Sequence, residues 1–377
     1  MSQLAFPLLV LALSGSPAQA GFVGALRLLP FLLLSLPAGA LVDRWNRKRV
    51  MILCDLGRVL IFASIPLAFI IGHLTVIHLY FAALLEGTFF TFFNLAETAS
   101  LSNVVATEQL AAAAAQNEAT YNFTSLVSPL LGGLLYALSR TLPFLADAIS
   151  YTFSIGSLFF IHTSFQSARH TTPLRLRTEI REGLLWLWHQ PLIRYLSLLT
   201  GGINLVFPSS ELLVIVLAQR QHTSAAWIGV IFAIGGIGSI IGALLSALVQ
   251  KKVQFGATII GVCWLMVAVW PLYIIARNSI SLALVFTGMA LLGPIYNVSQ
   301  FSYRTAQTPD ELQGRVNSVF RLVAFSLPPM GLALTGILLQ QFAFMLTVVA
   351  FWLFLLGLAL ATTLNTHVRY ARSVAVG

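Results

Sequence analysis

Apolar runs of about 20 residues recur along this chain, and short polar stretches separate them. A helix needs about 20 mainly apolar residues to cross a bilayer, and inside lipid its backbone must satisfy its own hydrogen bonds. We therefore expect an all-α membrane protein with eleven full spans and one short first run. The runs are Met1–Leu13, Phe22–Val42, Val50–Ile71, Val76–Ala96, Ala112–Leu138, Leu142–Ile161, Leu192–Leu217, Trp227–Val249, Phe255–Ala276, Ile280–Gln300, Val316–Gln340 and Phe342–Thr362.

The shortage of charge excludes several classes of protein. Only 9% of the 377 residues are charged and 58% are hydrophobic, whereas soluble domains carry about 25% charged residues. So few charges do not cover a water-facing surface, so we exclude a soluble enzyme and a nucleic-acid-binding domain. No Walker loop, catalytic triad or His/Cys metal cluster is visible, and we predict neither enzyme activity nor a cofactor or metal. Cys54 and Cys263 lie in apolar runs and are expected as small buried hydrophobes.

The basic residues fall mainly in alternate loops. If the short run counts as helix 1, the loops after even-numbered helices and the C-terminal tail hold fifteen Lys or Arg, Arg304 among them, and the opposite loops hold three. The positive-inside rule then places the even loops and the C-terminus in the cytoplasm. The net charge of +9 therefore indicates topology in a cell (plasma or inner) membrane, not a nucleic-acid partner.

The first run is too short to span a bilayer. Ser14-Gly15-Ser16-Pro17 follows it and is a turn signal, so the run resembles the second half of a helix. Either the true start lies upstream or the chain begins inside the membrane, and we favour an upstream start.

The two halves of the chain repeat each other. Gly39-Ala40-Leu41 recurs as Gly242-Ala243-Leu244, and Asn117 and Pro129 match Asn317 and Pro329. Two six-helix halves in the same orientation are typical of parallel-repeat transporters, whose binding site lies between the halves near the midplane.

The repeat predicts the domain organisation. We expect an N-terminal bundle at 1–162 with a partial helix 1, and a cytoplasmic linker with an amphipathic helix at 163–190. A C-terminal bundle at 191–363 and a cytoplasmic tail at 364–377 follow.

The most specific segment of the chain is Gly39-Ala-Leu-Val-Asp43-Arg44-Trp-Asn-Arg47-Lys48-Arg49. A glycine at position 39 permits close helix approach, and the Asp43 carboxylate suits a helix N-terminus. Alternatively, the basic residues only enforce topology. The segment resembles the loop 2–3 signature of the major facilitator superfamily, G-x-L-x-D-R-x-G-R-[KR], with Asn in place of the second Gly.

Further segments resemble signatures within that superfamily. Ser128-Pro129-Leu-Leu-Gly132-Gly133 is similar to the helix 5 signature of antiporters, and Pro129, Gly132, Gly133 and Pro329 are expected to bend helices 5 and 11. Three other segments resemble the branch of the superfamily that contains macrolide-efflux and enterobactin-exporter proteins. They are Leu36-Pro-Ala-Gly39, Asp147-Ala-Ile-Ser150 and Pro309-Asp-Glu-Leu-Gln-Gly-Arg315-Val-Asn317.

The resemblance implies a gate at loop 2–3. In the family arrangement Asp43 meets the start of helix 11 near Arg315, and this contact breaks when the halves rock apart. Glu97 ends helix 4 on the same side, and we predict that it pairs with Arg44 or Arg47. A solvated helix end is the alternative.

Ionisable residues inside membrane spans are functional hypotheses by default, because exposing them to lipid is costly. Glu86, halfway along helix 4, is the first candidate for proton coupling, followed by Glu211 and Asp147. Asp55 and Arg58, three residues apart, are predicted to form a structural pair. The predicted substrate cavity and coupling set is Glu86, Glu211, Arg27, Asp147, Asn204, Tyr296 and Asn297.

Together these features predict a secondary active transporter that works by alternating access. We expect proton-coupled efflux of hydrophobic or amphipathic small molecules of drug or siderophore type, by a monomer in contact with membrane lipids. The alternatives are uptake, lysolipid transport by the same fold, a non-transporting sensor, or an inactive truncated product.

Overall fold

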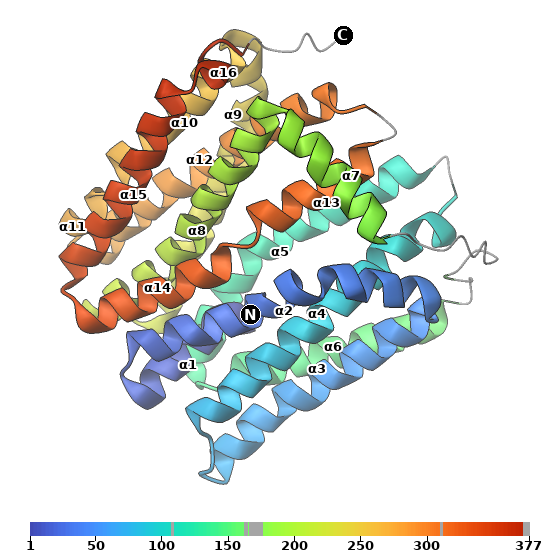
Figure 1. Cartoon of the computed structure of the whole chain (residues 1–377). Helices are drawn as coiled ribbons and strands as arrows, with labels where there is room; N and C mark the ends of the chain where they lie inside the picture. The colour runs from blue at the N-terminus through green and yellow to red at the C-terminus, as the bar shows by residue number, and fades with distance from the viewer. Residues whose placement is uncertain (107–108, 162–164, 166–175, 310–311, 372–377) are drawn as a thin grey trace. The chain divides into compact units, whose positions relative to one another are not determined.

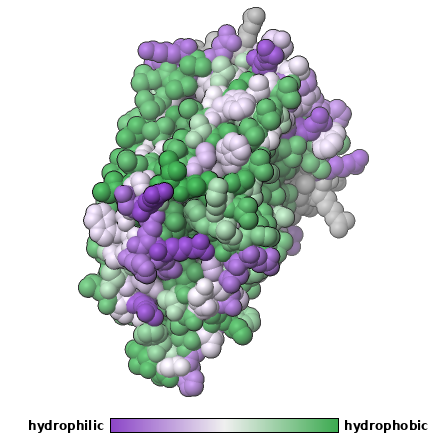
Figure 2. Space-filling model, turned by 90° about the vertical axis from the view of Figure 1, so that its left-hand side faces the viewer, coloured by the Kyte–Doolittle hydropathy of each residue, from purple (hydrophilic) through white to green (hydrophobic). Residues whose placement is uncertain are grey.

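A computed structural model of the chain describes residues 1–106, 109–161, 165, 176–309 and 312–371. These residues are almost entirely helical, and no strand occurs among them. Ten of their helical segments are long and apolar enough to cross a membrane. Apolar side chains cover much of the face shown in Figure 2, as expected where lipid takes the place of water. The all-α, multi-pass architecture predicted from the apolar runs is confirmed.

The helices form two compact units, which are described one at a time. Unit 1 comprises Met1–Leu174 and Ser224–Val230, and unit 2 comprises Arg175–Thr223 and Ile231–Gly377. The helices of unit 1 are α1 (Ser2–Ser14), α2 (Pro17–Arg44), α3 (Arg47–Ile70), α4 (Val76–Val104), α5 (Leu110–Leu138) and α6 (Leu142–Phe160), with the first turns of α9 (Ala225–Lys252).

The predicted turn between the first two runs is formed by its own residues. Gly15 ends α1 in the left-handed region at φ 65°, which glycine adopts without steric cost. The Ser16 hydroxyl then accepts a hydrogen bond from the Gln19 backbone N–H and caps α2, with Pro17 in its first turn, where a missing N–H costs nothing.

Helix α4 is central to the packing of unit 1. It packs on α2 and α3, and α6 packs on α3 as well (Figure 1). Gly87 makes the α2–α4 contact close, because a Cβ added there would overlap the carbonyl oxygen of Arg27. Gly132 of α5 has the same role toward α1, since an added Cβ would lie 2.9 Å from the Met1 carbonyl oxygen.

Unit 2 contains the remaining helices. They are α7 (Leu176–His189), α8 (Pro191–Arg220), most of α9, α10 (Phe255–Val269), α11 (Leu272–Ile275), α12 (Ser279–Gln307), α13 (Gln313–Ala324), α14 (Pro328–Gln341), α15 (Phe344–Leu364) and α16 (Thr366–Arg369). The predicted linker helix is α7, and it packs on α13 and α8 of this unit. Residues 163–164 and 166–175 of the predicted linker and 372–377 of the predicted tail lie outside the described residues.

Glycines also hold two helices of unit 2 close together. A Cβ added at Gly235 would overlap the Phe286 ring, and one at Gly242 would overlap the Leu291 carbonyl oxygen. The glycine spacing of α9 therefore serves close packing against α12, as small residues do in membrane helices generally.

The eleventh predicted run is interrupted. Helix α13 ends at Ala324 and α14 begins at Pro328, a break visible in the orange part of Figure 1. Pro328 has no N–H, so the Ala324 carbonyl loses its helical donor. The Asn204 side-chain amide of α8 replaces that donor at 2.9 Å. Helix α5, by contrast, continues through Pro129.

Candidate functional site

A buried ion pair joins the two parallel helices α2 and α4 of unit 1. The Arg27 Nε donates to the Glu86 Oε2 at 2.8 Å, and the side chains are 22% and 3% exposed respectively. The close approach at Gly87 brings the two helices within reach of this bond. Glu86 is therefore hidden from solvent, and Arg27 is the member that a ligand reaches first.

The sequence placed Arg27 and Glu86 in one predicted cavity but did not pair them. The pairing does have a sequence signal. Each residue is the eleventh of its helix, and two helices that run in the same direction place their eleventh residues at the same depth, about 15 Å from the helix starts. Matching the depths of opposite charges would therefore have predicted this pair.

Asp147 of α6 contacts the start of α1. Its Oδ2 accepts a hydrogen bond from the Ser2 backbone N–H at 2.8 Å and lies 3.5 Å from the Met1 nitrogen. A carboxylate at a helix N-terminus is stabilised by the helix dipole and by unpaired N–H groups. Asp147 thus lies near the Arg27–Glu86 pair, close enough to act on Arg27 electrostatically, but its hydrogen bond goes to the backbone of α1.

The predicted pair of Asp55 and Arg58 is confirmed. The Arg58 Nη1 donates to the Asp55 Oδ1 at 3.2 Å, and both side chains are buried. The Ser154 hydroxyl donates to the other Asp55 oxygen at 2.7 Å, and the Arg58 guanidinium lies 4.9 Å from the Phe93 ring centroid. These contacts link α3, α4 and α6. Each Asp55 carboxylate oxygen accepts a hydrogen bond, so the buried charge is compensated, as a structural role requires.

The predicted site residues of unit 2 differ in their surroundings. Tyr296 is fully buried, and its hydroxyl shares a 2.8 Å hydrogen bond with that of Thr200. The Asn204 side-chain amide donates to the Ala324 carbonyl at the break between α13 and α14. Asn297 is exposed, and Glu211 is half-buried on α8. Tyr296 and Asn204 therefore stabilise unit 2, and their part in substrate binding stays a prediction.

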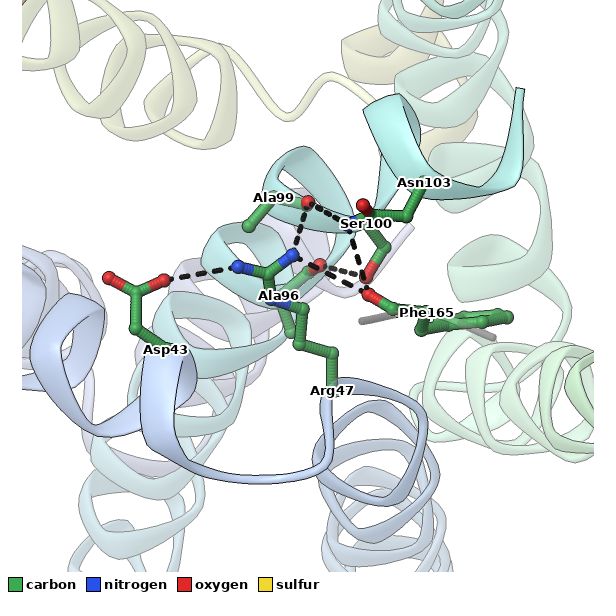
Figure 3. A network of polar contacts seen from close by, with 7 residues as sticks. All are labelled: Asp43, Arg47, Ala96, Ala99, Ser100, Asn103 and Phe165. Carbon is green, nitrogen blue, oxygen red and sulfur yellow. Dashed lines mark hydrogen bonds and ion pairs between the residues drawn. The ribbon is translucent and has the colours of Figure 1, made fainter. Parts of the chain in front are cut away.

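Loop 2–3 forms a dense polar network (Figure 3). Arg47 donates to the Asp43 carboxylate at 3.2 Å and to the Ala99 carbonyl at the end of α4 at 2.6 Å. It also reaches the Phe165 carbonyl at 3.5 Å, to which Asn103 donates at 3.2 Å. These bonds tie loop 2–3 to the last turns of α4 and to the chain that follows α6.

The network bears on one alternative of the Glu97 prediction and leaves the gating predictions open. Arg47 does not pair with Glu97 among the described ion pairs, because its donors go to Asp43 and to backbone carbonyls. Arg315 pairs with Glu182 of α7 at 2.5 Å. A Cβ added at Gly39 would meet no atom of unit 1 within 4 Å, and the close helix approach predicted there stays a prediction. The contact of Asp43 with the start of helix 11, and the roles of Arg44, Lys48 and Gly133, stay predictions.

Sequence reasoning missed one buried charge. Arg304 was counted in a cytoplasmic loop, but it lies in the last turn of α12 and is buried. The error arose because the apolar run ends at Gln300 while the helix continues to Gln307.

Two helical units with membrane-length helices define a multi-pass membrane protein. The Major Facilitator Superfamily model matches residues 1–332, and the chain belongs to this family. It is therefore a transporter with a small-molecule substrate and not an enzyme. The resemblance found in the sequence motifs is confirmed.

Relatives and solved structures agree with this assignment. The chain is 28% identical to the multidrug efflux pump Tap of Mycolicibacterium fortuitum, over 88% of this chain and 83% of that protein. It is 29% identical to the enterobactin exporter EntS of Citrobacter koseri, over 79% and 71%. A bacterial homologue of the lysosomal transporter Spinster, in an inward-facing and unoccupied conformation, has a TM-score of 0.75 at 14% identity and covers 97% of this chain and 95% of its own. The nucleoside transporter NupG has a TM-score of 0.67 at 13% identity and covers 96% of each chain. These structures show the fold.

Proposed function

We propose that this transporter exports hydrophobic or amphipathic small molecules in exchange for protons, and that Glu86 carries the proton. The observation that carries the proposal is the Arg27–Glu86 pair, a carboxylate that is 3% exposed and balanced by one guanidinium. The relatives Tap and EntS, named as a multidrug efflux pump and an enterobactin exporter, support the direction and the type of substrate.

The ion pair gives a simple exchange rule. When Glu86 is ionised, Arg27 neutralises it, and the pair is stable in its buried setting. A proton on Glu86 removes the negative charge and releases Arg27, because the guanidinium gains little from a neutral carboxyl group. A substrate that donates a hydrogen bond or a positive charge to Glu86 competes with the proton. Mutually exclusive occupation of one carboxylate is what exchange transport requires.

Aromatic residues follow Glu86 closely on α4, and three of them, Phe89, Phe92 and Phe93, contribute little to the substrate site. Phe92 stacks on Trp45, Phe93 packs on Arg58, and the Phe89 ring fills the space above Gly57. These three rings therefore pack within unit 1, and affinity for apolar substrates has to come from other residues of the transport pathway.

The loop 2–3 network supplies the proposed gate. Asp43 and Arg47 hold loop 2–3 on the end of α4, on the side that the basic residues predict to be cytoplasmic. A rigid loop transmits the rocking of its helices instead of absorbing it.

Drug accumulation in an efflux-deficient host tests the proposal. Cells that make the wild-type protein should accumulate less of a transported compound, and a protonophore should abolish the difference. Glu86→Gln should abolish it at an equal level of protein in the membrane. The double variant Asp55→Asn/Arg58→Gln is the matched control, since it removes another buried carboxylate of unit 1 without stranding its partner, and it should retain protonophore-sensitive export. If Glu86→Gln exports as well as wild type, Glu86 does not carry the proton.

A further inference from the structure

Unit 2 contains a buried guanidinium that the transport cycle proposed above does not use. Arg304, in the last turn of α12, is 5% exposed. Its Nη2 donates to the Asn317 side-chain oxygen at 3.0 Å, and the guanidinium lies 3.8 Å from the Phe320 ring centroid. Its Nη1 is buried and has no hydrogen-bond partner among the described residues.

The described surroundings of Arg304 contain no counter-ion. Among the described residues no carboxylate lies within ion-pair distance of it, whereas the half-buried Arg27 and the buried Arg58 of unit 1 each have one. Arg321, one helical turn after Asn317 on α13, adds a second positive charge that acts on Arg304. An amide oxygen and an aromatic face compensate a buried guanidinium only in part, because the desolvation of an ion in a protein costs several kcal/mol.

We propose that Arg304 and Arg321 form a binding site for an oxyanion, either free phosphate or the phosphate group of an acidic lipid. Guanidinium groups bind phosphate oxygens through paired, charge-assisted hydrogen bonds, and the unused Nη1 of Arg304 supplies the buried donor. The exposed Arg321 side chain supplies the second guanidinium, and the exposed Phe301 ring, 5.5 Å from the Arg304 guanidinium, moves aside to admit the anion.

The position of the site in the helix suits a lipid phosphate. Arg304 lies 25 residues after the start of α12 at Ser279, about 38 Å along the helix axis. That length exceeds the hydrocarbon core of about 30 Å, so Arg304 is at headgroup depth on the predicted cytoplasmic side. Basic pockets between helices at this depth bind anionic headgroups in other membrane proteins.

Thermal unfolding with defined anions tests the site. Sodium phosphate should raise the unfolding temperature of the detergent-solubilised protein by about 2 °C or more at saturation, beyond the effect of sodium chloride at equal ionic strength. Phosphatidylglycerol vesicles, compared with phosphatidylcholine vesicles, form the second arm and identify the lipid as the source. A response to neither phosphate nor phosphatidylglycerol overturns the proposal.

Variants separate anion binding from a merely structural arginine. Arg304→Gln should remove the anion response and leave the anion-free stability unchanged or higher, because it removes a buried charge without a counter-ion. Arg321→Gln, which changes an exposed side chain, should weaken the apparent affinity about threefold or more. Arg220→Gln, an exposed arginine at the end of α8, should retain the full response. An undiminished response in a folded Arg304→Gln protein contradicts the proposal.

A counter-ion supplied by the chain itself is the competing explanation. Asp310 and Glu311 lie outside the described residues. If the double variant Asp310→Asn/Glu311→Gln destabilises the wild-type protein but not Arg304→Gln, these side chains neutralise Arg304 and the oxyanion site is wrong. If it destabilises neither and the anion response persists, the proposal stands.

Discussion

Replacing Arg27 and replacing Glu86 should lower the free energy of unfolding by unequal amounts, although both changes break the same ion pair. Arg27→Gln leaves the Glu86 carboxylate unpaired at 3% exposure, whereas Glu86→Gln leaves an Arg27 side chain that is 22% exposed. Stranding a buried charge costs about 3–5 kcal/mol, and partial solvation of Arg27 reduces the cost on its side to about 1–2 kcal/mol. The double variant Arg27→Gln/Glu86→Gln strands neither charge and should lie within about 1 kcal/mol of wild type.

Thermal unfolding in detergent at one fixed scan rate measures this cycle. A loss of about 3 kcal/mol corresponds to about 6–12 °C for domains of this size, so Arg27→Gln should unfold well below Glu86→Gln. The coupling energy of the cycle should exceed about 2 kcal/mol. Equal losses from both single variants would refute the assignment of Glu86 as the hidden member of the pair.

Three further predictions concern packing and the gate. Gly87→Ala forces α2 away from α4 and should cost about 1–3 kcal/mol, whereas Gly156→Ala, where an added Cβ meets nothing within 4 Å, should be neutral or stabilising in the same unfolding assay. Asn204→Ala leaves the Ala324 carbonyl without its donor and should cost about 1–3 kcal/mol, with faster hydrogen exchange in the residues between α13 and α14; unchanged exchange would show that the bond is dispensable. Arg47→Gln removes the bonds to the Ala99 and Phe165 carbonyls and should slow transport without lowering the amount of folded protein, so unaltered transport would remove loop 2–3 from the gate.

The helices were predictable because a membrane span leaves a long, one-dimensional signal. Length and hydropathy alone placed both ends of α3 and the start of α4 within about three residues, whereas α4 continues to Val104, well beyond its predicted end at Ala96. The turn at Gly15 and Ser16 was predictable for a similar reason, since its residues determine it locally. The helix ends beyond the apolar runs were not predictable from hydropathy, and Arg304 was misplaced as a result.

The contacts between helices were harder to predict than the helices. Nothing local indicates that Gly87 faces the Arg27 carbonyl or that Asn204 replaces the donor that Pro328 lacks. Such contacts depend on the rotation of each helix about its axis, which a nearly uniform apolar sequence does not record. The pair at Asp55 and Arg58 was the exception, because both residues lie on one helix and their spacing fixes the geometry.

Uphill transport by the purified protein tests the account most directly. Wild-type protein in proteoliposomes with an imposed pH gradient should concentrate a transported compound toward the acidic side, and Glu86→Gln should only equilibrate it. Exchange of labelled for unlabelled compound should persist in Glu86→Gln, because exchange needs no proton. If the variant concentrates the compound as well as wild type does, proton exchange does not occur at Glu86, and the account built on its pairing with Arg27 is contradicted.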